Sequence, residues 1–285
     1  MNTQVKTKNI MRKFGIVANK RYGQNFLIDD NILENIVIAA DITAEDLVIE
    51  IGPGLGNLTE YILSKARYAI LVEIDSKMID VLEDRFKDYN NYSLINEDIL
   101  KVNIDSLVKD IETKNDFKFR KVKVVANLPY YITTPIIFKL LENENTISDI
   151  TVMVQKEVAQ RMVAKPKSKD FGILTLMVEY FSNAKIEIIV PNSSFIPEPG
   201  VESAVINLKK IRKYDVVNEK LFFELIHKAF AQRRKKMVNS LYATNFNNMS
   251  KQDIEKLFQK SSISLNTRAE ELTIEEFIKI ANNIN

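Results

Sequence analysis

The sequence predicts an α/β fold in which a seven-stranded sheet is followed by a small all-helical domain. Seven short apolar runs lie between residues 47 and 208, most of them separated by helical patterns. The first run, Leu47–Ile51, leads into glycines at positions 52, 54 and 56 and then into a helical pattern. From residue 209 onward only helical patterns occur. Together these features indicate a Rossmann-like sheet, with ligands expected at the carboxyl ends of its strands.

The elements follow one another in a consistent order. The first 20 residues are polar and basic without a clear period, so we expect a flexible arm there. Asp29 and Asp30 are candidate N-cap residues for the first helix of the sheet domain. We predict strands at 47–51, 68–72, 92–95, 122–126, 150–154, 186–190 and 204–208, and C-terminal helices at 221–230, 236–242, 254–258 and 274–280. The chain is thus expected to comprise an arm (1–20), a sheet domain (21–208) and a helical domain (209–285).

Composition narrows the class of protein. The 285 residues are 46% hydrophobic, with one His and no Cys, so disulfides and thiolate metal sites are excluded and a His-based zinc site is disfavoured. There is no apolar run of 18 residues and no secretory apolar segment at the N-terminus. We therefore expect a cytoplasmic, monomeric protein that uses neither a metal nor a membrane.

Two basic segments stand out although the net charge is only +2. The N-terminal basic segment (1–24) and the C-terminal basic segment (228–236) contain no acidic residue. Such local clusters favour a polyanionic partner, and the alternative is a solvated tail and a solvated helix face. Their cations are Lys6, Lys8, Arg12, Lys13, Lys20 and Arg21 in the first, and Lys228, Arg233, Arg234, Lys235 and Lys236 in the second.

The glycine-rich turn predicts a site for an adenosine-type cofactor. Glycine lets the backbone turn sharply and approach a ligand closely. Glu73 ends the second strand about 20 residues later, where an acid can accept hydrogen bonds from a ribose diol. Asp75 is expected to cap the next helix, and Asp98 could accept from an adenine amino group. This pattern leaves NAD, ATP and S-adenosylmethionine open, although the P-loop spacing is absent.

The fourth strand ends in an unusual sequence, Asn127-Leu128-Pro129-Tyr130. An ordinary turn is the simple interpretation, since Asn and Pro are common turn residues. The alternative is an adenine pocket. The Asn127 side-chain carbonyl and a backbone carbonyl, best that of Leu128, would bond an exocyclic amine and aim its lone pair at a methyl donor. Tyr130 would hold the ring by stacking, which contributes about 1–3 kcal/mol.

Four motifs in this order closely resemble the KsgA (RsmA) family of small-subunit rRNA adenine dimethyltransferases. They are Gln24-Asn25-Phe26-Leu27, Glu50-Ile51-Gly52-Pro53-Gly54-Leu55-Gly56, Asn127-Leu128-Pro129-Tyr130 and Phe195-x-Pro197-x-Pro199-x-Val201-x-Ser203. Arg233-Arg234-Lys235 with Asn239, and the run 268–272, also resemble that family. The resemblance covers the chain from about residue 12 to its end. It implies dimethylation of two adjacent adenosines in the 3′-terminal hairpin loop of small-subunit (16S) rRNA with S-adenosyl-L-methionine, during assembly of the small subunit.

The resemblance also implies roles for individual residues. The target base would contact Asn127, Leu128, Pro129, Tyr130 and Phe195, although Phe195 could instead be a core anchor. The Gln24–Leu27 segment could be a lid over the cofactor or a loop packed against a helix. Arg233, Arg234, Lys235 and Lys236 are expected to contact RNA phosphates. The cofactor contacts implied are Asn25, Leu27, Gly52, Gly54, Glu73, Ile74, Asp98, Ile99 and Asn127.

Three other functions compete with this prediction. An Erm-type enzyme would methylate a large-subunit (23S) rRNA adenine and confer macrolide resistance, but such enzymes usually carry Ile at the position of Leu128. A non-catalytic ribosome-assembly or RNA-binding factor, or a mitochondrial transcription-factor relative, would not need the intact Asn127 and Tyr130. A Rossmann dehydrogenase would need the G-x-G-x-x-G spacing, which differs from the G-x-G-x-G found here.

Overall fold

The computed structural model describes residues 2–19, 22–142 and 145–284. The chain divides into two compact units, one formed by residues 1–159 and 183–210 and the other by residues 160–182 and 211–285. We call them the sheet unit and the helical unit. The helical unit starts close to the predicted boundary at residue 209, but it also takes in 160–182, which we had expected in the sheet domain. The apolar face of the helix at 173–181 explains this, because it packs into the core of the helical unit.

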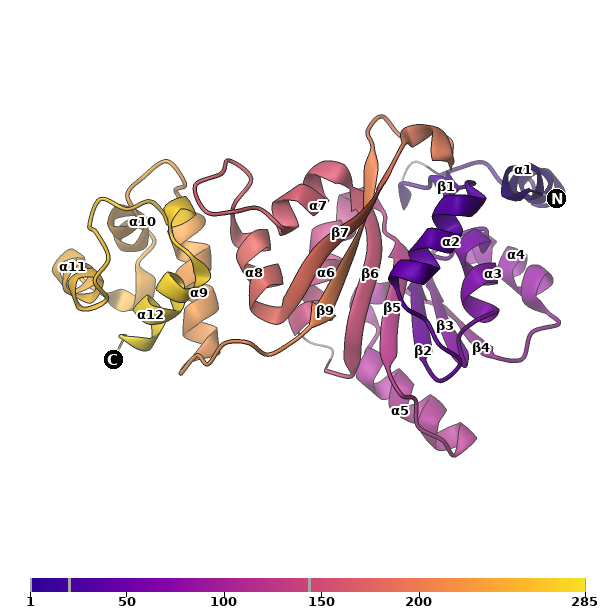
Figure 1. Cartoon of the computed structure of the whole chain (residues 1–285), viewed down its shortest axis with the longest axis horizontal. Helices are drawn as coiled ribbons and strands as arrows, with labels where there is room; N and C mark the ends of the chain where they lie inside the picture. The colour runs from indigo at the N-terminus through magenta and orange to yellow at the C-terminus, as the bar shows by residue number, and fades with distance from the viewer. Residues whose placement is uncertain (1, 20–21, 143–144, 285) are drawn as a thin grey trace. The chain divides into compact units, whose positions relative to one another are not determined.

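The sheet unit is built on one seven-stranded sheet with the order β4-β3-β2-β5-β6-β9-β7 (Figure 1). Adjacent pairs from β4 to β6 are parallel, and β9 is antiparallel to β6. This confirms the predicted fold class and all seven strands. Their bounds are β2 Leu47–Ile51, β3 Tyr68–Glu73, β4 Tyr92–Asn96, β5 Val122–Asn127, β6 Ile147–Gln155, β7 Ser182–Val190 and β9 Ser203–Lys210.

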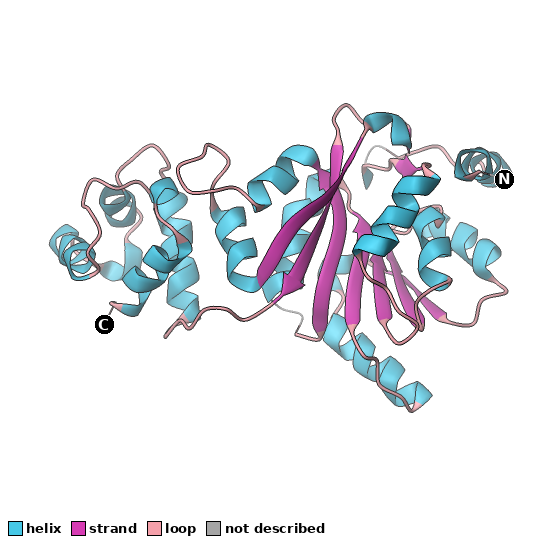
Figure 2. Ribbon diagram, viewed as in Figure 1, coloured by secondary structure: helices cyan, strands magenta, loops and turns pink. Residues whose placement is uncertain are grey.

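Helices cover both faces of this sheet (Figure 2). One face packs against α2, α3 and α4 through alternate strand residues such as Val48, Leu71 and Val125. The residues between them, including Ile49 and Val124, are also buried. A sheet buried on both faces explains why the strands are continuous apolar runs without polar alternation. The helices of this unit are α1 Thr3–Phe14, α2 Asp30–Ala39, α3 Asn57–Leu63, α4 Ser76–Phe86, α5 Ile104–Asn115 and α6 Thr133–Glu142, with α7 Lys156–Met162 at the division between the units.

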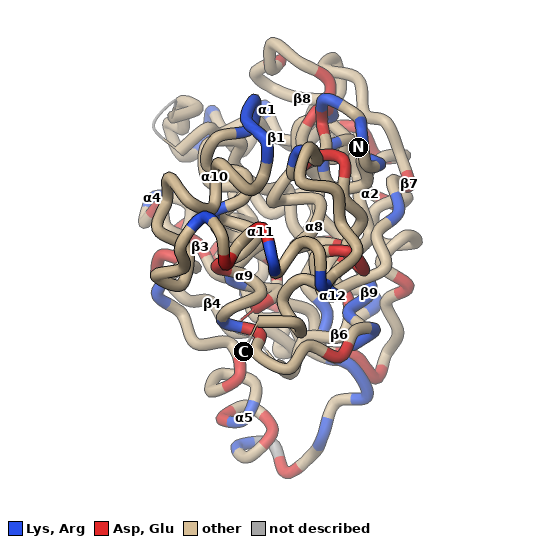
Figure 3. Tube along the Cα trace, turned by 90° about the vertical axis from the view of Figure 1, so that its left-hand side faces the viewer, with Lys and Arg blue, Asp and Glu red and all other residues tan. Residues whose placement is uncertain are grey.

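Local capping explains where several helices begin. Asp29 accepts hydrogen bonds from the backbone amides of Asn31 and Ile32, and Asp75 accepts one from Lys77, so these two predicted N-caps are confirmed. Asp30, the other candidate, is the first residue of α2 instead. Helix α5, which we did not predict, carries charges of both signs (Figure 3).

Within the described part of the chain, no helix has the length and apolar character needed to cross a membrane.

The first residues do not form the irregular arm that we expected. Residues 3–14 are the helix α1, capped by the Asn2 side chain and ended by Gly15 in the left-handed conformation. Thr3 and Thr7 on this helix are buried, so α1 is docked on the sheet unit. Its residues Ile10, Met11 and Phe14 pack against a small core that contains Phe26 and Leu55. Lys20 and Arg21, which we had counted in the N-terminal basic segment, lie outside the described residues.

The helical unit has its own core. Helices α8 Ile173–Phe181, α9 Glu219–Phe230, α10 Met237–Ala243, α11 Lys251–Lys260 and α12 Ile274–Asn282 form it. Their buried apolar faces join in one cluster around Phe222, Leu241, Phe258 and Phe277. All four predicted C-terminal helices are present, within a few residues of the expected bounds.

Candidate active site

A pocket lies at the carboxyl ends of β2, β3 and β5, where parallel α/β sheets bind their ligands. It is concave, partly open to solvent and lined by a mixture of apolar and polar residues, as small-molecule sites usually are. Most of the predicted site residues line it. They are Asn25, Leu27, Gly52, Gly54, Glu73, Ile74, Asn127, Leu128, Pro129 and Tyr130.

The glycine-rich turn forms the floor of this pocket. Gly52 has φ +66°, which favours glycine, and a Cβ at this position would have no atom within 4 Å. A ligand can therefore approach the Gly52 backbone directly. Gly56 has φ +80°, and a Cβ there would lie 2.6 Å from the Phe86 ring. Its glycine thus permits close packing of the turn on α4 as well as the turn itself.

Glu73 is held rigidly at the end of β3. One of its carboxylate oxygens accepts from the Gly54 amide at 3.0 Å and the other from the Asp75 amide at 2.8 Å. Each oxygen keeps a second lone pair, so the carboxylate can also accept from a diol in the pocket. Burial raises the pKa of Glu73, and the backbone amides oppose that rise. This geometry is the one expected of a ribose-binding acid.

Glu50 also lines the pocket, although the sequence analysis did not single it out as a site residue. It lies on β2, its side chain is buried, and it accepts a hydrogen bond from Thr59 Oγ1 at 2.6 Å. Desolvation raises its pKa to about 8. The signal was available, because an acid two residues before the first glycine of the turn interrupts an otherwise apolar strand.

The Asn127 side chain is fixed in one orientation. Its amide nitrogen donates to the backbone carbonyl of Asn25 at 3.1 Å. Because that bond uses the amino end of the side chain, the carbonyl oxygen Oδ1 is the end left to accept a hydrogen. The backbone amide of the next residue, Leu128, donates to the Met153 carbonyl at 3.0 Å and ties the turn to β6. The pocket therefore has a positioned acceptor at the end of β5.

The rest of the motif shapes the wall of the pocket. The Pro129 carbonyl accepts from the Ile132 amide and from Thr133 Oγ1, so it is already engaged. Tyr130 is half-buried, and its hydroxyl lies 2.7 Å from Ser203 Oγ. Burial raises the pKa of Tyr130, which keeps its phenol neutral. The ring is thus anchored at its hydroxyl end while it lines the pocket.

The Gln24–Leu27 segment is part of the wall. Its last two residues form β1 (Phe26–Leu27), which pairs antiparallel with β8 (Phe195–Ile196). Gln24 donates to Asp75 at 2.8 Å, and the Leu27 carbonyl accepts from Asn57 at 2.8 Å. These bonds hold the segment in place against the pocket, and its role in covering the cofactor stays a prediction.

Three predicted residues do not line the pocket. Asp98 caps a short 3-10 turn at Ile99–Lys101 by accepting from the Leu100 amide, and the Ile99 side chain is buried. Both follow β4, next to β3 in the sheet. Phe195 is only 1% exposed and packs in the core with Leu27 and Leu33. Stacking of a base on Phe195 remains a prediction, and it requires that the ring become exposed.

The C-terminal basic segment belongs to the helical unit. Arg233, Arg234, Lys235 and Lys236 are all exposed. Arg233 pairs with Glu270 at 2.6 Å, and Lys236 donates to the Asn266 side chain at 2.6 Å.

Among the described residues, no group of three or more His, Cys, Asp or Glu side chains could hold a metal ion.

Comparisons with known proteins find similarity over almost the whole chain. The family model for ribosomal RNA adenine dimethylase matches residues 16–285. The protein named ribosomal RNA small subunit methyltransferase A from Alkaliphilus oremlandii is 46% identical over 281 residues, covering 98% of this chain and 96% of that protein. The protein of the same name from Clostridioides difficile is 45% identical, with coverage of 98% and 95%.

Solved structures show the same architecture. A dimethyladenosine transferase from Plasmodium falciparum superimposes with a TM-score of 0.74 at 27% identity, covering 90% of this chain and 95% of that one. The 23S rRNA methyltransferase ErmE gives a TM-score of 0.66 at 21% identity, with coverage of 91% and 99%, which shows a shared fold.

Proposed function

The chain belongs to the ribosomal RNA adenine dimethylase family, and we infer that it dimethylates two adjacent adenosines in the 3′-terminal hairpin loop of small-subunit rRNA. It is an S-adenosyl-L-methionine-dependent rRNA methyltransferase. The observation that carries our assignment of the reacting site is the bond from Asn127 to the Asn25 carbonyl, which leaves Asn127 Oδ1 as an acceptor in the pocket.

The pocket residues fit the methyl donor. Open space above the Gly52 backbone admits a ligand, and the buried Glu73 carboxylate keeps lone pairs for the two ribose hydroxyls. Leu27 and Ile74 offer apolar surface for a purine ring. When bound, S-adenosyl-L-methionine supplies an electrophilic methyl group on a sulfonium. We propose that Asn25, Gly54, Asp98 and Ile99 complete its site.

Asn127 and Leu128 would prepare the nucleophile. The lone pair of the adenine amine is delocalised into the ring, so the free base is a poor nucleophile. Hydrogen bonds from the amine to Asn127 Oδ1 and to the Leu128 carbonyl would favour a pyramidal nitrogen and aim its lone pair. No strong base would be needed for the attack, because an N–H proton becomes acidic only once the nitrogen carries the methyl group and a positive charge. That proton would then pass to solvent. Most of the rate enhancement would come from orientation of the two reactants.

Tyr130 and Pro129 would hold the base during transfer. The Tyr130 ring is anchored by Ser203, so stacking on it costs little side-chain entropy. The base must leave its own stack to reach the pocket, which costs a few kcal/mol and less in a loop. A hairpin loop is therefore a suitable substrate. We further propose that the enzyme acts as a cytoplasmic monomer on the assembling small subunit, with Arg234, Lys235 and Lys236 of the C-terminal basic segment on RNA phosphates.

Replacement of Asn127 by Ala tests this mechanism. We expect methyl transfer to unmethylated small subunits, measured by mass spectrometry of rRNA fragments, to fall by at least 100-fold while RNA affinity changes little. Asn192→Ala is a matched control, because Asn192 is exposed in the same unit. Full turnover by Asn127→Ala would refute the role of the amide. Methyl groups in large-subunit rRNA instead would refute the substrate.

A further inference from the structure

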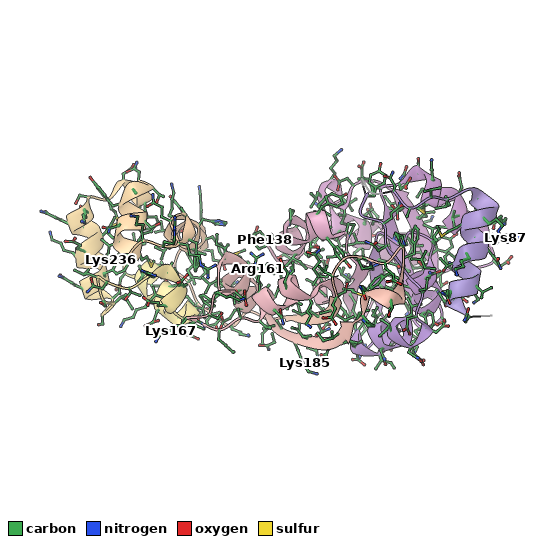
Figure 4. All side chains as sticks on the ribbon, turned by 90° about the horizontal axis from the view of Figure 1, so that it is seen from above. Lys87, Phe138, Arg161, Lys167, Lys185 and Lys236 are labelled. Atoms are coloured by element: carbon green, nitrogen blue, oxygen red, sulfur yellow. The ribbon has the colours of Figure 1, made fainter. Side chains whose placement is uncertain are left out.

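We propose that the loop at 165–170 forms a second RNA-phosphate contact beside the C-terminal basic segment, and that Arg233 braces the two segments without binding phosphate itself. This proposal rests on the rRNA substrate given above and refines how that substrate is held. It concerns the helical unit alone. Lys167 and Lys236, one from each segment, are labelled in Figure 4.

Three segments meet at this place. Arg233 Nε donates to Glu270 Oε2 at 2.6 Å, and Arg233 Nη2 donates to the backbone carbonyl of Lys169. The Lys167 amide donates to the Glu270 carbonyl at 2.7 Å. Met237, which follows the basic segment, donates from its amide to the Thr267 carbonyl at 2.8 Å. The loop, the basic segment and residues 267–270 are therefore joined into one surface.

The loop is held in an unfavourable backbone conformation. Lys167 has φ +71°, in the left-handed region that non-glycine residues seldom occupy. Such a conformation costs about 1 kcal/mol or more and persists where neighbouring contacts impose it. Here the Glu270 carbonyl and the Arg233 guanidinium supply those contacts. The loop is thus presented in a fixed shape.

The charges on this surface suit a phosphate backbone. The side chains of Lys167 and Lys169 are exposed, as are those of Arg234 and Lys235. Lys165 is less suitable, because it interacts electrostatically with the half-buried Glu179 carboxyl. Burial raises the pKa of Glu179, and Lys165 partly opposes that rise. Arg233 is also less suitable, because its guanidinium is already engaged by Glu270 and the loop carbonyl. Loop cations next to the basic segment can follow a phosphate backbone over several nucleotides.

The test is the salt dependence of RNA affinity in the full-length protein. Each lost phosphate contact lowers the slope of log K against log [salt] by about one unit. We expect Lys167→Gln with Lys169→Gln to lower it by about two. Lys220→Gln with Lys251→Gln removes the same charge from exposed positions on α9 and α11 and should leave it unchanged. Equal slopes for the two double variants would overturn the loop contact.

A charge-neutral double variant tests the brace. Arg233→Gln with Glu270→Gln removes the ion pair without changing net charge. We expect the salt slope to stay constant, while amide hydrogen exchange at 167–170 becomes faster and RNA affinity falls a few-fold. A slope lower by one unit would show that Arg233 itself binds phosphate. Loss of the proposed substrate is a different outcome, because the wild-type protein would then fail to methylate small-subunit rRNA.

Discussion

The two basic segments look alike in the sequence but are used differently in the structure. In the N-terminal segment, Lys6 pairs with Glu60 at 3.0 Å and Lys13 pairs with Asp84 at 2.6 Å. Both lie on α1, which buries Thr3 and Thr7. In the C-terminal segment, Arg233 through Lys236 stay exposed on a surface shared with a second basic loop. Lys6 and Lys13 therefore help to fasten α1 to the sheet unit, whereas Arg234 and Lys235 of the other segment face solvent.

The difference lies in the uncharged residues between the cations. Thr7 Oγ1 accepts from Asn57 Nδ2 at 2.8 Å, and the same nitrogen donates to the Leu27 carbonyl. Helix α1 thereby joins the wall of the cofactor pocket through one shared amide. A count of charges could not reveal this, because the buried threonines carry the docking. It follows that the first segment should affect cofactor binding and the second should affect RNA binding.

Replacement of the shared amide, Asn57→Leu, should have the largest effect. It removes the donor to the Leu27 carbonyl and to the Thr7 hydroxyl. It also removes one acceptor of Arg85, which keeps its bonds to the Leu55 carbonyl and to Glu60. We expect a loss of stability on the order of 3 kcal/mol, measured by urea denaturation, together with weaker binding of S-adenosyl-L-methionine by calorimetry. Asn192→Leu is an exposed control that should leave both unchanged. Normal cofactor affinity in Asn57→Leu would break the link between α1 and the pocket.

Thr7→Val should have the next largest effect, about 1–2 kcal/mol, because it removes one buried acceptor and preserves the side-chain shape. Thr7→Ser keeps the hydroxyl and should restore most of the difference. The salt slope of RNA affinity should be the same in all three proteins. If Thr7→Ser destabilises the protein and Thr7→Val does not, the methyl group rather than the hydrogen bond secures the helix.

Paired charge removals compare the two segments directly. Lys6→Gln with Lys13→Gln should lower stability only slightly, because exposed ion pairs contribute little, and should leave the RNA salt slope unchanged. Arg234→Gln with Lys235→Gln should do the reverse, lowering the slope by about two units with stability unaffected. Equal slopes for these variants would remove the distinction between the segments.

The seven strands and most of the helices that pack on the sheet could be predicted because local signals determined them. Apolar runs, glycines and N-cap acids act within a few residues, and Glu73, Asn127 and Tyr130 follow from their places at strand ends. The docking of α1 could not be predicted, since it depends on Asn57, 50 residues from Thr7. The pairing of β1 with β8 joins positions even further apart. Phe195 illustrates the same limit, because a motif position does not reveal whether its ring lines the pocket or the core.

The smallest effect expected is a pH dependence of α1 docking. Hydrogen bonding by Thr3 is the main cause that lowers the pKa of Asp30 below 3.8. Because the pKa of Asp30 is lower in the folded than in the unfolded state, its ionised carboxylate stabilises the fold above pH 3.8. This stabilisation is lost as the pH falls from 3.8 through the folded-state pKa. Since Asp30 is partly exposed, the contribution should stay under about 1 kcal/mol.

The absence of cysteine allows a clean measurement of this effect. A spin label on a single Lys8→Cys site, exposed on α1, should become more mobile as the pH falls below 3.8, and Asp30→Asn should flatten that response. A label on Lys235→Cys, in the other basic segment, should show no such change, because no interaction with Asp30 holds that segment. The same response at both sites would mean that acid loosens the whole protein and that α1 has no separate anchor.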